Sequence, residues 1–171
     1  MSSADQGYHC DPEHFRSAMR YFPASVCVIT TGTAPNRSGL TATAVCSLSM
    51  APPRILVCLN AETTTCKAIQ ANTRFAVNVL SQNHIELARC FGGIGQAPAG
   101  EQRFSQGCWR DGAFGVPVLD DALHVLECGL IRCHEAGTHN ILVGQVLHVP
   151  KQGQHEALLY RNGTFGSWAP L

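Results

Sequence analysis

Threonine and alanine alternate within residues 39–49, and this stretch carries the strongest chemical signal of the chain. If it forms a strand, Thr41 and Thr43 point to one face and Ala42 and Ala44 to the other, because successive side chains alternate. Small side chains let a flat ligand approach the backbone, while hydroxyls and free N–H groups can hold anionic or carbonyl oxygens. The segment is therefore a candidate ligand-binding strand, and its alternative is a tightly packed sheet face without a ligand.

A hydroxyl-rich turn follows the apolar run 54–59, in the order Asn60-Ala-Glu-Thr63-Thr64-Thr65. A strand would here give way to a helix whose first backbone N–H groups lack intrahelical partners. Such groups, together with hydroxyls, can bind a phosphate. The same residues could serve only as a helix cap. No Gly-x-Gly-x-x-Gly and no Gly-Lys-Ser/Thr sequence offers another phosphate loop.

His139 is the third candidate, because it follows Gly137 and Thr138 beside the start of a predicted strand. A loop at this point could present the imidazole to a cleft. The alternative is an ordinary surface histidine, one of eight in the chain. No Ser-His-Asp arrangement or carboxylate pair is needed for the chemistry considered below.

The elements that would position these residues are mainly strands. Asp11-Pro12-Glu13 indicates a helix start, and the helix would carry an apolar stripe that ends at Pro23. Strands are predicted over 25–31, 39–49, 54–59, 74–80, 122–134 and 140–149, with 160–165 closing the domain. Short helices are predicted to end at Ala71 and to cover 82–90, and a Gly/Ala/Pro-rich loop covers 92–100. The prediction is a disordered terminus over 1–10 and one mainly β, barrel-centred domain over 11–171.

Composition narrows the classes of protein. Apolar residues make up 45% of the 171 residues and charged residues only 14%, which is sparse for a monomer surface and predicts a homodimer. The net charge is zero without a Lys/Arg cluster, so we expect no nucleic-acid partner. No apolar run approaches the roughly 18 residues that span a bilayer, and the N-terminus has no signal-peptide pattern. We therefore expect a cytoplasmic protein.

The nine cysteines are expected to be reduced structural thiols, because the number is odd and no Cys-x-x-Cys occurs. One cluster offers ligands for a metal: Cys128, Cys133, His134 and His139. The neighbours Cys133 and His134 would point to opposite faces of a strand, which prevents convergence on one ion. No metal is predicted.

The order of motifs resembles the flavin reductase family over residues 15–165. Within that family the chain is most similar to the reductases that serve 4-hydroxyphenylacetate monooxygenase and pyrimidine catabolism. The matching segments are Phe15-Arg16-Ser17-Ala18-Met19, Val28-Ile29-Thr30-Thr31, Gly39 to Ser47, Pro52-Pro53, Asn78-Val79-Leu80, Arg103-Phe104 and Gly137-Thr138-His139. The resemblance implies an FMN-binding split β-barrel.

The same resemblance implies roles for residues. The Ser/Thr-rich turn with Thr64 and Thr65 would contact the flavin phosphate, and the strand 41–44 would lie along the ring and ribityl chain. His139 would contact the nicotinamide nucleotide. Four further residues would lie near the flavin, on a neighbouring strand or beside the loop: Asn78, Phe91, Gly92 and Arg103. Thr138 replaces a carboxylate found in some reductases, which leaves the orientation of the histidine open, and Phe22-Pro23-Ala24-Ser25 lacks the glycine that many members have.

The function implied is an NAD(P)H:flavin oxidoreductase that supplies reduced FMN or FAD to a separate monooxygenase. Direct hydride transfer from nicotinamide C4 to flavin N5 needs stacking and proximity from the protein, and no acid or base. NADH is expected rather than NADPH, because a 2′-phosphate usually recruits Arg or Lys and no basic cluster exists. Alternatives are a non-catalytic flavin-binding electron carrier or sensor, and an FMN-dependent reductase of another substrate such as a corrinoid.

Overall fold

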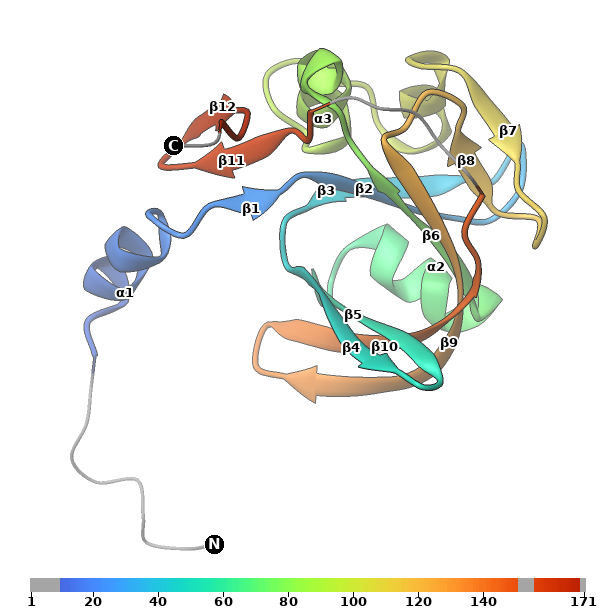
Figure 1. Ribbon diagram of the computed structural model, residues 1–171, viewed down its shortest axis with the longest axis horizontal. Helices are drawn as coiled ribbons and strands as arrows, with labels where there is room; N and C mark the ends of the chain where they lie inside the picture. The colour runs from blue at the N-terminus through green and yellow to red at the C-terminus, as the bar shows by residue number, and fades with distance from the viewer. Residues whose placement is uncertain (1–9, 151–155, 170–171) are drawn as a thin grey trace, which may run out of the picture.

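A seven-stranded antiparallel sheet, curled into a half-barrel, forms the centre of the molecule (Figure 1). The computed structural model describes residues 10–150 and 156–169, so residues 1–9 of the predicted disordered terminus lie outside the described part. The strand order is β3-β2-β6-β9-β10-β5-β4. The bounds are β2 Cys27–Thr31, β3 Ser38–Ala42, β4 Val45–Met50, β5 Pro53–Asn60, β6 Arg74–Val79, β9 His124–Ala136 and β10 His139–His148. The prediction of a mainly β, single-domain split barrel is confirmed.

Smaller elements surround this sheet. Two further sheets join β1 Ala24–Ser25 to β11 Leu159–Arg161 and β12 Thr164–Gly166, and β7 Trp109–Asp111 to β8 Pro117–Leu119. The helices are α1 Pro12–Met19, α2 Thr64–Asn72 and α3 Ile85–Phe91, with 3₁₀ turns η1 Gln82–His84 and η2 Gly100–Ser105. No helix of the described residues is long and apolar enough to cross a membrane.

The curled sheet is covered on both faces. Val28 and Ala76 pack with α3 in one cluster, whereas Ile29 and Val77 pack with α2 in the other. Figure 1 shows α2 inside the curl and α3 outside it. The alternation of neighbouring residues between the two clusters follows from the period of two along a strand. Both helices are thereby fixed against the sheet, which positions their ends at its rim.

The predicted strand over residues 39–49 is interrupted, which corrects that prediction. β3 ends at Ala42 on one edge of the seven-stranded sheet, and β4 begins at Val45 on the opposite edge. Thr43 and Ala44 therefore carry the chain across the opening of the half-barrel. The Val45 N–H bonds to the Thr43 carbonyl at 3.0 Å, which makes a tight local bend. The small residues that suggested a ligand-binding strand thus form a crossing between two strands.

The first helix begins where the sequence predicts. Asp11 Oδ1 accepts hydrogen bonds from the N–H groups of Glu13 at 2.8 Å and His14 at 3.0 Å. The apolar stripe, however, faces solvent: Phe15 and Phe22 are 60% and 65% exposed, and no residue of α1 is buried. α1 stands away from the body of the chain (Figure 1).

Candidate functional site

A pocket of ≈ 430 Å³ opens where the crossing between β3 and β4 meets the ends of three other elements. These ends are the last residues of β5, the first of β10, and the C-terminus of α3. The lining residues are Leu40, Thr41, Ala42, Thr43, Ala44, Cys58, Leu59, Asn60, Thr63, Phe91, Gly92, Arg103 and His139. All of the residues predicted for the site lie here except Thr64, Thr65 and Asn78.

The end of β5 and the start of β10 place Asn60 opposite His139, because these two residues are paired in the antiparallel ladder. The Asn60 Oδ1 accepts a hydrogen bond from the Glu62 N–H at 2.9 Å. His139 is exposed, and its Nδ1 lies 2.9 Å from Thr138 Oγ1. Its Nε2 has no hydrogen-bond partner among the described residues. Thr138 therefore contacts one ring nitrogen of His139 and leaves the other free to meet a ligand.

α2 begins beside Asn60, and its first turn is capped by Thr63. The Thr63 hydroxyl donates to the Asn60 carbonyl at 2.8 Å and accepts from the Cys66 N–H at 3.3 Å. The Thr65 hydroxyl lies 2.9 Å from Ser38 Oγ. Thr65 itself is only 2% exposed. The Thr65 hydroxyl thus links α2 to β3. Thr64 is exposed to solvent and does not line the pocket. What the turn can offer a phosphate is the backbone N–H groups at the first two helical positions.

Arg103 closes one side of the pocket by bonding to the backbone of three segments. Its Nε donates to the Pro98 carbonyl at 2.9 Å, and its Nη1 donates to the carbonyls of Gly39 at 3.1 Å and Phe91 at 3.3 Å. A guanidinium that satisfies three carbonyls holds β3, α3 and the loop before η2 in one arrangement. Its first role in the structure is therefore to shape the pocket wall.

Glycine and threonine keep β3 close to α3. A Cβ on Gly39 would lie 2.8 Å from the Phe91 ring, so the absence of a side chain lets the ring pack against the strand. On the same strand, the Thr41 hydroxyl donates to the Ala88 carbonyl at 2.8 Å. The Thr41 hydroxyl is therefore engaged by the protein, whereas Thr43 is exposed at the crossing.

Asn78 lies in the core and does not reach the pocket. Its side chain is fully buried, and its Nδ2 donates to the Val28 carbonyl and to Thr30 Oγ1, each at 3.1 Å. Its Oδ1 accepts from the Leu119 N–H at 2.8 Å. The amide is thus committed to joining β2, β6 and β8, which corrects its predicted place beside a flavin.

No cysteine of the described residues belongs to a cluster arranged to bind a metal. All nine are free, and the described residues contain no group of three or more His, Cys, Asp or Glu arranged to hold an ion. Burial, and to a smaller extent the neighbouring Glu127 carboxylate, together raise the pKa of the Cys128 thiol to about 12. Cys58 lines the pocket, and burial raises the pKa of its thiol as well, followed by the effect of Cys46. A thiol held protonated is a poor nucleophile and a poor metal ligand.

Three lining residues have no direct signal in the amino-acid pattern: Leu40, Cys58 and Leu59. Each is a near neighbour of a predicted site residue, and at the end of a strand consecutive residues can both reach a rim. The pocket's size lies within the range of about 300–1,000 Å³ that is usual for ligand sites. Small residues at the β3–β4 crossing, hydrogen-bonding groups at the strand ends and free helical N–H groups fit a flat ring with a polar edge and a phosphate.

Comparisons with known proteins agree with this fit. Residues 19–169 match the family described as flavin reductase like domain. The chain is 41% identical over 148 residues to the FMN reductase (NADH) RutF of Agrobacterium fabrum, which covers 86% of this chain and 83% of that protein. It is 39% identical over 151 residues to the 4-hydroxyphenylacetate 3-monooxygenase reductase component of Pseudomonas aeruginosa, covering 88% of each. BorF, the flavin reductase component of a bacterial two-component tryptophan halogenase, superimposes with a TM-score of 0.84 at 29% identity, covering 94% of this chain and 100% of that one.

Proposed function

We propose a specific reaction for this chain, which belongs to the flavin reductase family: it reduces FMN or FAD with NADH and passes the reduced flavin to a separate monooxygenase. The observation that supports it best is the meeting of the β3–β4 crossing, the N-terminus of α2 and His139 at one pocket. The names of the matched relatives, an NADH-dependent FMN reductase and a monooxygenase reductase component, point to the same reaction.

Each part of the pocket has a task in this proposal. The backbone and small side chains over residues 41–44 receive the flat ring, and Thr63 with the first N–H groups of α2 receives the phosphate. A bound flavin supplies the electron-accepting ring, to which the nicotinamide delivers hydride directly. His139 binds and orients the nicotinamide nucleotide through its free Nε2, so that the two rings stack at reacting distance. No described residue needs to move a proton for this step.

Steady-state oxidation of NADH and NADPH, each with FMN, FAD and riboflavin, tests the proposal. We expect steady NADH oxidation on addition of free flavin, and slower oxidation of NADPH, because no free cation of the pocket lining is placed for a 2′-phosphate. Arg103, the one cationic side chain of that lining, is largely engaged by carbonyls. Flavin binding without NADH oxidation would indicate a carrier or sensor, and activity that strictly requires a third substrate would indicate another reductase.

The proposal includes a homodimer in the cytoplasm. An eight-residue helix without buried residues is too short to be stable alone in water, which supports a partner surface for α1. Leu48 and Met50 on the edge strand β4 add exposed apolar surface, at 48% and 83% exposure. Nine free cysteines suit a reducing compartment. Light scattering should give about twice 18.4 kDa, and a mass that stays at 18.4 kDa over a concentration series would contradict the dimer.

A further inference from the structure

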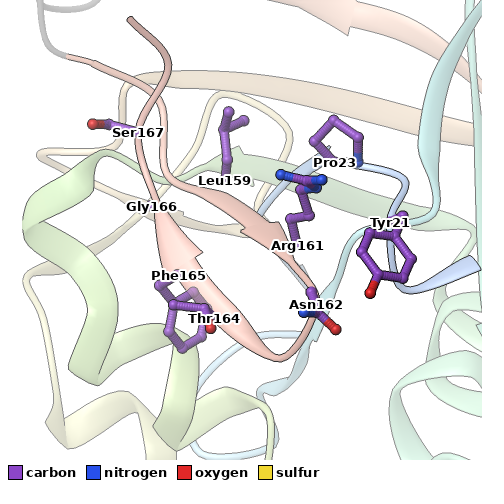
Figure 2. Close-up of a pocket in the computed structure, with 9 residues that line it drawn as sticks. All are labelled: Tyr21, Pro23, Leu159, Arg161, Asn162, Thr164, Phe165, Gly166 and Ser167. Carbon is purple, nitrogen blue, oxygen red and sulfur yellow. The ribbon is translucent and has the colours of Figure 1, made fainter. Parts of the chain in front are cut away.

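Two pockets of similar size differ in whether they contain a thiol. The pocket over the β11–β12 hairpin has a volume of ≈ 400 Å³, and none of the nine described residues that line it is a cysteine (Figure 2). The candidate flavin pocket, of ≈ 430 Å³, has Cys58 in its lining. Of these two pockets, the flavin pocket is therefore the one whose wall a change in thiol chemistry would alter.

A second cysteine, Cys46, lies beside Cys58 on the neighbouring strand. In the β4–β5 ladder Cys46 stands opposite Leu56, two residues from Cys58, so the two cysteines are diagonal neighbours on one face of the sheet. Burial raises the pKa of the Cys58 thiol, and the charge of Cys46 raises it too, which shows that the two groups interact. Cys46 is exposed, whereas Cys58 is half-buried. The pair thus joins a thiol open to solvent to a thiol of the pocket wall.

Both cysteines are connected to the β3–β4 crossing. The Cys58 N–H donates to the Ala44 carbonyl at 2.9 Å, and Cys46 follows Ala44 by two residues. Ala44 itself lines the flavin pocket. In the described sheets β4 is an edge strand that is hydrogen-bonded to β5 alone, and its register shifts between Ser47 and Ser49. A movement of β4 against β5 would therefore displace the crossing and leave the other strands in place.

We propose that Cys46 and Cys58 form a peroxide-sensitive thiol pair, whose oxidation to a disulfide displaces the β3–β4 crossing and lowers the affinity for flavin. The inference rests on the proposed function, because reduced flavin that no oxygenase consumes reacts with O2 to give oxidised flavin and hydrogen peroxide. The peroxide then slows further flavin reduction by the protein that produced it.

The two chemical steps balance without another reactant. The Cys46 thiol attacks hydrogen peroxide, the O–O bond breaks, and the products are a sulfenic acid and one water molecule. The Cys58 thiol then attacks the Cys46 sulfur, the S–O bond breaks, and the disulfide forms with release of a second water molecule. Peroxide is reduced by two electrons, and two thiols are oxidised to one disulfide. Cys46 reacts first because it is exposed, whereas burial favours the protonated form of Cys58.

The diagonal placement makes the bond both disruptive and reversible. Diagonal neighbours on antiparallel strands have Cα atoms about 7–8 Å apart, whereas a disulfide usually joins Cα atoms that are about 4.4–6.8 Å apart. Closing the bond therefore requires β4 to shift against β5, which an edge strand with one partner allows. A disulfide that forms under strain is readily reduced by a small thiol such as glutathione.

Oxidation of the purified full chain tests the pair. We expect hydrogen peroxide to produce a Cys46–Cys58 disulfide, identified by peptide mass spectrometry without reductant. FMN binding should weaken by about fivefold or more, as for the loss of one hydrogen bond to the ligand, and dithiothreitol should restore it. Cys46→Ser removes the thiol outside the pocket lining and should bind FMN normally before and after peroxide. The matched control, Cys108→Ser, removes another exposed thiol and should lose FMN affinity on oxidation as the wild type does.

Three results would overturn the proposal: no linkage between Cys46 and Cys58, a linkage that leaves FMN affinity unchanged, or the same loss of affinity in Cys46→Ser as in the wild type. The third result would assign the loss to oxidation elsewhere in the chain. Neither the oxidation nor the binding measurement needs NADH. A protein that shows the peroxide effect but oxidises no NADH would therefore contradict the proposed reaction and leave the thiol pair standing.

Discussion

Asparagines at the exposed end of β5 and in the buried part of β6 show how position decides what a polar residue does. Asn60 ends its strand, is exposed, and uses one side-chain hydrogen bond, to the N–H of Glu62. Asn78 lies within its strand, is fully buried, and makes three side-chain hydrogen bonds. A strand end leaves hydrogen-bonding capacity for a ligand, whereas a strand interior must satisfy every buried polar atom internally.

The same contrast separates other polar residues of the sheet. Thr30, in the buried strand β2, donates to the Pro117 carbonyl at 2.6 Å and is fully buried. His139 at the start of β10 is exposed, with one ring nitrogen unused by the described residues. The comparison makes a testable distinction: changes at strand interiors should lower stability, and changes at strand ends should lower binding or activity.

The largest effect is expected for Asn78→Ala. The change leaves the Leu119 N–H without its acceptor and two acceptors without their donor inside the core, which should cost about 3 kcal/mol of unfolding free energy. Urea unfolding measures the loss. Asn60→Ala is the matched control and should cost less than about 1 kcal/mol, because its hydrogen bond is exposed. Equal losses for the two variants would break the distinction.

His139→Ala should have the next largest effect, on catalysis. Loss of the nucleotide contact and of ring alignment should raise the KM for NADH and lower kcat/KM about tenfold, with flavin affinity nearly unchanged. The unfolding free energy of this variant should equal that of the wild type, because the His139 side chain is exposed. His134→Ala removes another exposed histidine outside the pocket and should have wild-type kinetics. If the His139→Ala variant also has wild-type kinetics, His139 is an ordinary surface residue.

A backbone donor at the start of α2 can be removed selectively by Thr64→Pro. Proline is tolerated at the first helical position, and Thr63 with ψ of 142° already has the extended conformation that precedes proline. Loss of one N–H to a phosphate should weaken FMN binding up to about tenfold and spare riboflavin, which lacks the phosphate. Thr64→Val keeps the N–H and should bind FMN normally. Equal weakening of FMN and riboflavin by the proline variant would place the phosphate elsewhere.

How much the sequence could predict depends on how local each signal is. Asp11 and Thr63 cap helices within three residues of their own position, and both caps are confirmed. The break at Thr43 and Ala44 could not be foreseen, because these residues suit a continuous strand and the crossing exists only when the sheet curls. The short β7–β8 hairpin was also missed, since three-residue strands carry almost no periodic pattern.

The candidate site shows the same limit. Residue types predicted hydroxyls, small side chains and a histidine, but their meeting at one pocket depends on strands far apart in the sequence. Asn78 illustrates the failure most clearly: the partner of its Oδ1, Leu119, lies 41 residues away. Arg103 braces Gly39 and Phe91 from positions 64 and 12 residues distant. Contacts of that kind are set by tertiary packing and leave no local pattern.

Glu127, inside β9, offers the finest test of the comparison, because it is a buried carboxylate that should act only on stability. It is 1% exposed and accepts hydrogen bonds from the N–H groups of Ala113 at 3.1 Å and Phe114 at 2.9 Å, with His148 Nδ1 at 2.9 Å. Burial raises the pKa of Glu127, but the bonds from His148, Phe114 and Ala113 outweigh it, so the pKa lies below its usual value.

A carboxyl whose pKa is lower in the folded state binds fewer protons there than in the unfolded state. The contribution of Glu127 to the unfolding free energy is therefore present above its pKa in the unfolded state, about 4.3. This contribution is lost as the pH falls through the lower pKa of the folded state. The wild type should lose more unfolding free energy than Glu127→Gln between pH 7 and pH 3, because only the wild type has a carboxylate that must be protonated in the folded state. Calorimetric unfolding across this range measures the difference. Because Glu127 lies outside the pocket, flavin affinity at pH 7 should match the wild type, and a selective loss of flavin binding would show that strand interiors also serve the site.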